Sequence, residues 1–123
     1  MIAVDYNGYL TFREGLFEAL DDGLYTAEWL DGMVWAGIIR VIAGDDAAIM
    51  FKIKGYPTGA RVLCGVGSTG NLDTIVNSLI PQAEDFARDM GCISARISSR
   101  PGWVKALKDS GYSLYKTTIR KGL

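Results

Sequence analysis

Hydrophobic residues recur at helical spacing twice near the start of the chain, and the pattern then changes to short strand-like segments. A capping box over residues 11–14 predicts the start of one helix, and Thr26 is a suitable cap for a second helix that Gly37 would end. Turn-forming residues then separate three segments of strand-like pattern, at residues 38–43, 49–54 and 60–66. This order predicts two helices followed by an antiparallel meander.

The strongest helical pattern covers residues 72–90, where apolar side chains recur every three or four positions. Pro81 lies inside this pattern and lacks a backbone N–H, so we expect it to kink the helix or to split it. Leu79 and Phe86 lie on the apolar stripe and are expected to be buried. Gly91 would end the helix.

The last third of the chain predicts a strand, a short helix and a final strand. Residues 92–98 alternate, a helix is expected between Pro101 and Gly111, and residues 112–120 again have a strand-like pattern. Trp103 is expected in the core or lining a cleft. In the strand at 92–98 the buried face would carry Ile93, Ala95 and Ile97.

The change from a meander to a strand–helix–strand order has a topological consequence. Residues 60–66 and 92–98 should run parallel and be joined by a right-handed crossover. We therefore expect one α/β domain over residues 1–123, with a central mixed sheet.

Composition and charge narrow the classes of protein. The chain is 49% hydrophobic and 22% charged, which favours a packed core over disorder. Its 13 basic and 14 acidic side chains are spread without blocks, so we expect neither nucleic acid nor an anionic membrane as a partner. The sequence has no segment of the roughly 20 apolar residues that a membrane span needs, and its first residues lack the pattern of a secretory signal. A cytoplasmic location, in a bacterial or host cell, is expected.

The sequence contains no histidine. Catalytic systems that pair histidine with serine or cysteine are therefore excluded, a zinc site is disfavoured, and no metal is expected. Cys64 and Cys92 lie in apolar runs and are expected to be buried free thiols. A redox pair would require the two strands that carry them to be neighbours.

The order of elements and three segments resemble the GNAT acyltransferases. The segments are residues 61–72, 83–92 and 106–112, and the last resembles the family's helix that ends in glycine and an aromatic residue. The resemblance covers about residues 38–120 and implies a three-layer α/β domain with helices on both faces of the sheet. Shorter pieces also look like small GNAT-like proteins of phages and prophages, namely Tyr56-Pro57, Ala83-Glu84 and Arg100-Pro101-Gly102-Trp103.

The candidate ligand site is a glycine-rich segment between a strand and a helix. A turn that leads into a helix N-terminus offers unpaired backbone N–H groups and the positive end of the helix dipole, which suit a pyrophosphate. The resemblance implies that this segment holds the pyrophosphate of acetyl-CoA or another acyl-CoA, while the preceding strand pairs with the pantetheine arm. Arg100, after the next strand, could contact a phosphate or is a solvated flanking residue. The segment consists of Gly65, Val66, Gly67, Ser68, Thr69, Gly70 and Asn71.

A second interpretation of this segment is a structural turn without a ligand. The three defining positions of the family's loop correspond to Gly65, Ser68 and Gly70, and only Gly70 matches the family's residue. No basic residue lies in the segment, and Asp73 places a negative charge in the first helical turn. The segment also matches a dinucleotide-binding pattern, but the acidic residue expected about 20 positions later is missing, which disfavours a nicotinamide or flavin cofactor.

The sequence does not identify a catalytic residue. The family often has a tyrosine where this chain has Leu107, and an asparagine where it has Arg100. Acyl transfer to an amine needs a base for the amine and an acid for the leaving thiolate. Tyr112 and Tyr115 are candidate acids. The candidate bases are Glu14, Glu18, Glu28 and Asp31.

Two functional hypotheses remain. In the first, the chain is an acyl-CoA-binding protein and N-acyltransferase with a degenerate active site and an amine acceptor. In the second, the scaffold serves as a non-catalytic virion or host-interaction module of a phage or prophage. Its partners would then be phage or host proteins, and it would be associated with the virion.

Overall fold

The computed structural model describes residues 6–21, 23–98 and 102–123. The chain begins with two helices, α1 (Tyr6–Glu18) and α2 (Ala27–Trp35), and then forms a four-stranded sheet whose order is β1-β2-β3-β4. The strands are β1 (Arg40–Ala43), β2 (Ala47–Gly55), β3 (Arg61–Gly70) and β4 (Ser94–Ile97).

A long helical segment connects β3 to β4. It consists of α3 (Leu72–Thr74), the π turn η1 (Ile75–Leu79) and α4 (Ile80–Asp89). After β4 come the short helix α5 (Gly102–Ala106) and the 3₁₀ turn η2 (Lys108–Ser110).

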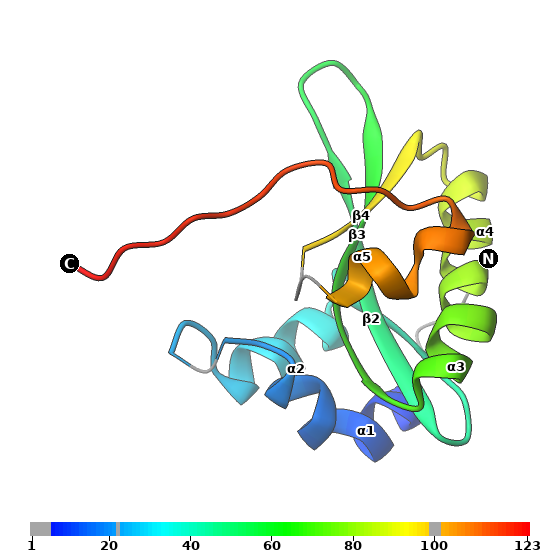
Figure 1. Cartoon of the computed structure of the whole chain (residues 1–123). Coiled ribbons are helices and arrows are strands. Elements are labelled where there is room, and N and C mark those ends of the chain that lie inside the picture. The colour runs from blue at the N-terminus through cyan, green and yellow to red at the C-terminus, as the bar shows by residue number, and fades with distance from the viewer. Residues whose placement is uncertain (1–5, 22, 99–101) are drawn as a thin grey trace.

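The predicted sheet topology is confirmed. β1 with β2, and β2 with β3, pair antiparallel, whereas β3 and β4 pair parallel from Val62↔Ser94 to Gly65↔Ile97. The helical segment between β3 and β4 is the expected crossover. The result is a mixed α/β sheet with helices on both faces (Figure 1).

Each face of the sheet buries its own hydrophobic cluster, because alternate side chains of β2 point to opposite faces. Phe51 packs with Leu79 and Phe86 under α4, and Met50 packs with residues of α1 and α2 on the other face. Leu79 and Phe86 are only 1% and 3% exposed, which confirms the predicted stripe. Figure 1 shows α1 and α2 on one side of the strands and α3–α4 on the other.

A partly buried polar contact joins α1 to α2. Arg13 donates two hydrogen bonds to the Asp31 carboxylate, from Nε and Nη2, each at 2.7 Å. The hydroxyl of Tyr9, whose side chain is fully buried, donates to the same carboxylate. Thr26 caps α2 as predicted, because its Oγ1 accepts the N–H of Trp29 at 3.1 Å.

The helical segment from Leu72 runs through Pro81 without breaking. The backbone N–H of Ile80 donates to Ile75, five residues back, and forms the π turn. Pro81 follows directly at the start of α4. A π turn is a usual way for a helix to change its hydrogen-bond pattern, and here it lies where proline removes a donor. Gly91 ends the segment with φ of +78°.

Three local predictions are wrong. Helix α1 begins at Tyr6, so Thr11 is no cap and its hydroxyl donates to the Asn7 carbonyl oxygen within the helix. Ile93 precedes β4 and is 75% exposed instead of buried. Residues 112–120 form no strand, and the chain after Gly111 has no regular structure up to residue 123. Pro101 lies outside the described residues.

Both cysteines are free and partly buried. Cys64 lies on β3, and Cys92 lies just before β4, the strand that pairs with β3. The register places Cys64 opposite Arg96, four residues beyond Cys92, so the two thiols do not form a cross-strand pair. Burial raises the pKa of the Cys92 thiol. In the described residues, no helix has the length and apolar character needed to cross a bilayer.

Candidate functional site

The site lies where β3 and β4 separate. Pairing of these strands ends at Gly65↔Ile97, but β3 continues to Gly70 in its ladder with β2. A bulge marks the same place, since Met50 pairs with Gly67 and Phe51 with Gly65, which leaves Val66 as the extra residue. Beyond the bulge, therefore, one edge of β3 is not covered by β4.

The ladder with β2 determines which backbone groups face this open edge. The N–H of Asn71 donates to the Asp46 carbonyl oxygen at 3.0 Å, so residues 71 and 46 form a hydrogen-bonded pair. In an antiparallel ladder, hydrogen-bonded and non-hydrogen-bonded pairs alternate. The N–H and C=O groups of Ser68 and Gly70 are thus directed away from β2 and toward the open edge.

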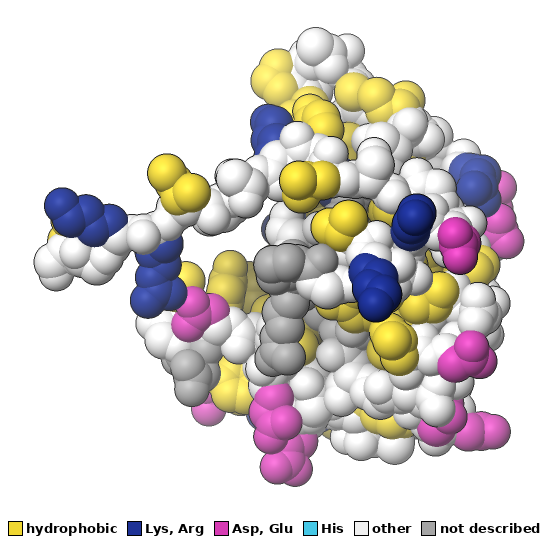
Figure 2. Space-filling model, viewed as in Figure 1, with side chains coloured by type: hydrophobic (Ala, Val, Ile, Leu, Met, Phe, Trp, Pro, Cys, Tyr) yellow, Lys and Arg dark blue, Asp and Glu magenta, His cyan; other side chains and the backbone are white. Residues whose placement is uncertain are grey.

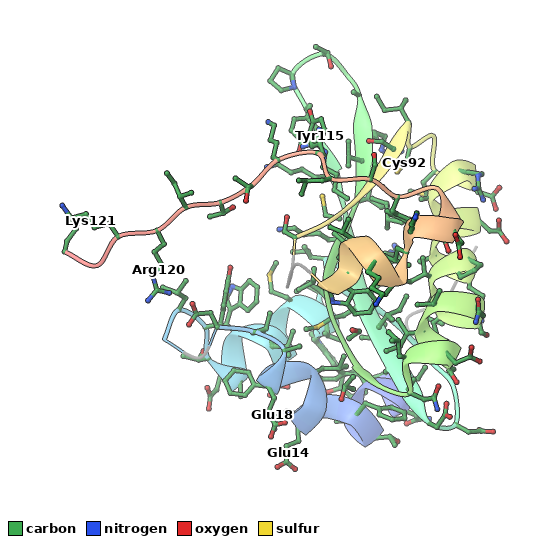
Figure 3. The ribbon with its side chains drawn as sticks, viewed as in Figure 1. Glu14, Glu18, Cys92, Tyr115, Arg120 and Lys121 are labelled. Carbon is green, nitrogen blue, oxygen red and sulfur yellow. The ribbon has the colours of Figure 1, made fainter. Side chains whose placement is uncertain are left out.

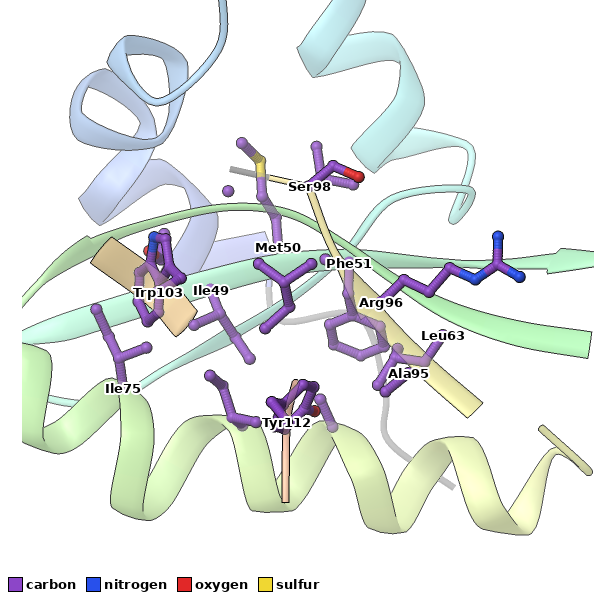
Figure 4. A pocket seen from close by; sticks show the side chains of 17 residues that line it. Ile49, Met50, Phe51, Leu63, Ile75, Ala95, Arg96, Ser98, Trp103 and Tyr112 are labelled. Atoms are coloured by element: carbon purple, nitrogen blue, oxygen red, sulfur yellow. The ribbon is translucent and has the colours of Figure 1, made fainter. Parts of the chain in front are cut away.

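A cavity of about 60 Å³ lies where the two strands diverge. Its floor comes from the long helical segment through Ile75, Ile80 and Ala83, and one wall comes from Trp103 and Tyr112 (Figure 4). A cavity of this size holds a few non-hydrogen atoms, so a larger ligand would have to extend along the open edge of β3.

Tyr112 is the polar residue of the cavity wall with the most defined partner. Its hydroxyl donates to Oε2 of Glu84 on α4 at 2.6 Å. Burial, together with this hydrogen bond, raises the pKa of Tyr112 above its usual value. The phenol therefore stays protonated at neutral pH, with its proton directed toward Glu84.

Arg96 forms the outer side of the site. Its guanidinium lies 5.5 Å from the ring centre of Tyr56 and 4.8 Å from that of Tyr115. Its Nη1 also donates to the Tyr56 hydroxyl at 3.4 Å. This stacking holds the first part of the C-terminal segment against the β2–β3 hairpin.

The segment predicted as a ligand loop is mostly strand. Gly65, Val66, Gly67 and Ser68 belong to β3 and line the cavity. Thr69 points to the opposite face, where its side chain packs against Gly15 of α1. The glycine pattern favours a turn, but pairing with β2 keeps residues 65–69 in an extended strand.

Gly70 serves the fold in a way that the sequence did not reveal, whereas Asn71 is the helix cap that the sequence predicts. Gly70 has φ of +99°, and a Cβ there would overlap the Asp46 carbonyl oxygen, so glycine is required by the chain's own turn. Asn71 caps the helix, since its Oδ1 accepts the N–H of Thr74 at 3.1 Å. Arg100 lies outside the described residues.

The candidate catalytic groups are dispersed. Asp31 is held by Arg13 and Tyr9, and the hydrogen bonds from Arg13 lower its pKa, so it is not available as a base. Leu107 is 1% exposed and packs in the cluster beneath α4. The acidic side chains on α1 and α2 are exposed, namely Glu14, Glu18 and Glu28. Figure 3 shows Glu14 and Glu18 pointing away from the cavity side of the molecule.

Sequence reasoning missed Glu84 and Arg96. In the sequence, Glu84 is one of several charged residues in the helical pattern, and Arg96 occupies a polar position of an alternating strand pattern. Only the packing of α4 against Tyr112, and of β4 against Tyr56, brings them to the site. Among the described residues, no group of three or more Cys, Asp or Glu side chains could hold a metal ion.

Solved structures with a similar fold include several acetyltransferases. A ribosomal-protein-alanine N-acetyltransferase from Brucella melitensis has a TM-score of 0.65 and 11% identity, covering 96% of this chain and 94% of that one. An aminoglycoside N-acetyltransferase in complex with CoA has a TM-score of 0.65 and 15% identity, covering 95% and 94%. A predicted acetyltransferase with acetyl-CoA, from Clostridium acetobutylicum, has a TM-score of 0.62 and 10% identity, covering 78% and 71%.

The sequence itself matches no family model, and a search of curated proteins gives no match. At 10–15% identity the likeness concerns the arrangement of the backbone. The order of the strands, the parallel pair at its end and the crossover helix are all part of that likeness. The chain therefore has the fold of the GNAT acetyltransferases.

Proposed function

We propose that this chain binds an acyl-CoA along the open edge of β3 and transfers the acyl group to an amine. The observation that carries the proposal is the edge itself, where the backbone groups of Ser68 and Gly70 lead to the cavity at the divergence of β3 and β4. The pantetheine arm of CoA contains two amides, so it can pair with a strand edge much as a peptide does. Two solved structures of similar fold contain acetyl-CoA or CoA.

The residues of the site fit such a ligand in part. The strand edge and the cavity, with its mostly apolar lining, suit the extended arm and a short acyl group. The first helical turn suits the pyrophosphate less well, because it carries Asp73 and the N–H of Asn71 is already used by Asp46. We therefore expect weak binding, with the pyrophosphate near Leu72 and the remaining free backbone N–H groups.

The chain's own contribution to transfer would be to position the acyl group and to exclude water. A bound acyl-CoA supplies the activated acyl group as a thioester. Leu107 has no ionisable group, and the Tyr112 proton is held by Glu84, so among the described residues that line the cavity we expect no free acid or base to assist. The acceptor amine must then arrive deprotonated, and the rate of transfer should rise with pH until the amine itself has lost its proton.

Calorimetric titration with acetyl-CoA and with CoA tests binding. The Asp73→Asn variant should bind more tightly by about 0.3–1 kcal/mol, since it removes a negative charge from the first helical turn. Asp89→Asn, at the far end of α4, is the matched control and should leave the affinity unchanged. Arg100→Ala should weaken binding if that side chain turns toward the site.

Three outcomes separate the hypotheses. Binding with acyl transfer to an amine supports the proposal. Binding without transfer to any amine tested would make the chain an acyl-CoA-binding module. If neither the parent nor Asp73→Asn binds at millimolar ligand, the segment is structural, and the hypothesis of a non-catalytic interaction module takes its place. The resemblance to phage-encoded proteins and a virion location stay predictions.

A further inference from the structure

A group of cationic and aromatic side chains lies beside the cavity, where β4 approaches the β2–β3 hairpin. Arg96 is at its centre, stacked between the rings of Tyr56 and Tyr115. Each ring also carries a lysine, because Nζ of Lys54 lies 5.1 Å from the ring centre of Tyr56 and Nζ of Lys116 lies 5.2 Å from that of Tyr115. Three cations thus alternate with two aromatic rings. These five residues are called the basic–aromatic cluster below.

The cluster is assembled from three separate parts of the chain. Lys54 and Tyr56 come from the end of β2 and the hairpin, Arg96 from β4, and Tyr115 and Lys116 from the C-terminal segment, residues 112–123. Figure 2 shows basic side chains beside the hairpin and along this segment. The fold therefore gathers positive charge at one place, although the chain as a whole has a net charge of −1.

No carboxylate of the described chain neutralises this charge. The ion pairs among the described residues use arginines elsewhere, at positions 13, 88 and 120, and none includes a cation of the cluster. Neighbouring cations of the cluster share a ring and are close enough to repel each other. A bound anion would offset this repulsion, so the cluster has the electrostatics of an anion site.

Arg96 is held in a position that suits an anion. Its side chain is partly buried, and the two rings restrict the guanidinium and remove part of its hydration. A guanidinium has five N–H donors. In the described structure its one hydrogen-bond acceptor is the Tyr56 hydroxyl, at a long 3.4 Å from Nη1. The remaining donors can bind two oxygens of a carboxylate or phosphate side by side.

The cluster lies away from the place where we expect the phosphates of an acyl-CoA. Arg96 pairs with Cys64, whereas the pyrophosphate is expected beyond Gly70, at the other end of β3. At about 3.3 Å per residue, these two positions on β3 are separated by about 20 Å. The stem of Arg96 lines the cavity, and its guanidinium points away from the cavity centre (Figure 4). A molecule that contacts both the cluster and the cavity therefore approaches from the side opposite the pyrophosphate.

We propose that the basic–aromatic cluster binds a carboxylate or phosphate of the acceptor, and that the acceptor is a small amine carrying such an anionic group. This inference rests on the proposed acyl transfer. Arg96 holds the anionic group while the amine reaches the thioester at the cavity. There the C–N bond of the amide forms, the C–S bond of the thioester breaks, and the proton lost by the nitrogen ends on the CoA thiolate. A neutral amine would leave the cluster without a counter-ion and should bind less well.

Acetyl transfer to matched amines tests this selection. β-Alanine and ε-aminocaproate are compared with the amino alcohols of the same length, and phosphoethanolamine is compared with ethanolamine. In the parent, KM should be at least about 10-fold lower for the anionic member of a favoured pair. Arg96→Gln should abolish this preference, and Arg96→Lys should restore part of it, because lysine keeps the charge but lacks the planar fork. The KM for acetyl-CoA should stay unchanged.

Two further variants control for indirect effects. Arg88→Gln is the matched control, since Arg88 forms an exposed ion pair with Asp85 on α4, and it should retain the preference. Arg96→Gln also removes the stacking on Tyr115. The Lys54→Gln/Lys116→Gln chain leaves Arg96 in place and should lower the preference by about 2- to 5-fold.

Binding in the absence of acyl-CoA separates this inference from the proposed function. The Nε–Hε resonance of Arg96, assigned by its loss in Arg96→Gln, should shift on addition of the favoured anionic amine and stay in place with the matched amino alcohol. A shift without acyl transfer would support the anion site and reject the transfer reaction. A response to carboxylates alone, or to the phosphate alone, supports the proposal and identifies the group.

Other results would overturn the proposal. One is an Arg96 resonance that no anionic amine shifts, and another is an active parent with equal KM values for the matched amines. A third is an equal shift with acetate or inorganic phosphate at the same concentration, since the cluster would then bind an adventitious ion only.

Discussion

Single residues of the candidate site have a structural role in the fold, in addition to the proposed role in binding a ligand. Gly70 is an example, because its positive φ and its contact with the turn at Asp46 and Ala47 both require the absence of a side chain. We predict that Gly70→Ala lowers the free energy of unfolding by at least about 1–3 kcal/mol. Chemical denaturation measures this loss.

The control for that substitution is Gly32→Ala in α2. A Cβ at Gly32 would meet no atom within 4 Å beyond its chain neighbours and the backbone of its own helix, and the φ of Gly32 is not positive. Because alanine favours a helix over glycine, this variant should gain about 0.5–1 kcal/mol. If Gly70→Ala were as stable as the parent, the close approach of β3 to the turn at Asp46 would be wrong.

Asp31 makes stability depend on pH. Its pKa is lowered in the folded state by the hydrogen bonds from Arg13 and by the one from Tyr9. A carboxylate of this kind stabilises the protein above the ordinary Asp value of about 3.9 and loses that contribution as the pH falls through its lower folded pKa. Asp31→Asn should therefore be less stable at pH 7 and show a flatter decline in melting temperature below about pH 4.

The measurement is a set of thermal melts from acid to neutral pH on the parent and Asp31→Asn. Asp85→Asn is a suitable control, because Asp85 makes an exposed ion pair with Arg88 and its carboxylate is 78% exposed. Surface pairs of this kind contribute little to stability. Equal pH profiles for the parent and Asp31→Asn would show that the contact between α1 and α2 is not formed in solution.

At the scale of elements, the stripe of the long helical segment carries the core beneath the sheet. Leu79→Ala should lower the free energy of unfolding by about 2–5 kcal/mol, and Phe86→Ala by about 3–5 kcal/mol, since each leaves a cavity against β2. Thermal or denaturant unfolding checks both. Leu72→Ala, which changes a half-exposed side chain at the start of α3, should cost far less. Unchanged stability in both core variants would mean that the stripe faces a partner.

Elements defined by local signals were predicted well from the sequence. The helix after Asn71 has a cap, a strong period and a terminal glycine, and all three occur in the structure. The four residues at 11–14 also looked like a local signal, but α1 continues through them because Tyr9 and Leu16 are buried on one face. The burial of these two side chains favours a continuous helix more than the capping box favours a helix start at Thr11.

Elements defined by pairing were harder to predict. The glycines of residues 67–70 favour a turn, yet β2 pairs with each of these residues. The alternating pattern of residues 112–120 favours a strand, yet no neighbour pairs with them in the described chain. A strand depends on a partner that is distant in sequence, so its own residues decide only part of the outcome.

At the scale of the molecule, β2 joins the two hydrophobic clusters. Met50 belongs to one cluster and Phe51 to the other, so neither cluster can loosen without disturbing the same strand. We predict a single cooperative unfolding transition. Trp29 and Trp35 report on α2 and Trp103 on the cavity wall. Tryptophan fluorescence of Trp103→Phe, and of a Trp29→Phe/Trp35→Phe chain, should give the same midpoint, and separate midpoints would contradict the prediction.

The place where β3 and β4 diverge could be predicted, but the walls of the cavity there could not. A parallel pair of strands and the helix after them indicate where this edge of the sheet lies, and Gly65 to Ser68 line the cavity at that edge. The walls come from residues far apart in sequence, such as Glu84 with Tyr112 and Arg96 with Tyr56. Their contacts depend on how α5 and the hairpin close over the sheet, which no local pattern encodes.

The four residues of β4 have a thermodynamic consequence. The side chains of Ala95 and Ile97 line the cavity, while the backbone N–H and C=O groups of the same two residues form the outer side of the strand, because the register with β3 turns those of Ser94 and Arg96 toward β3. A molecule that binds the outer side of β4 orders the strand and so lowers the free-energy cost of ligand binding in the cavity. By linkage, a ligand in the cavity changes the affinity of the outer side for that molecule by the same factor. Occupancy of the two sides of β4 is thus linked, and either one can be read by measuring the other.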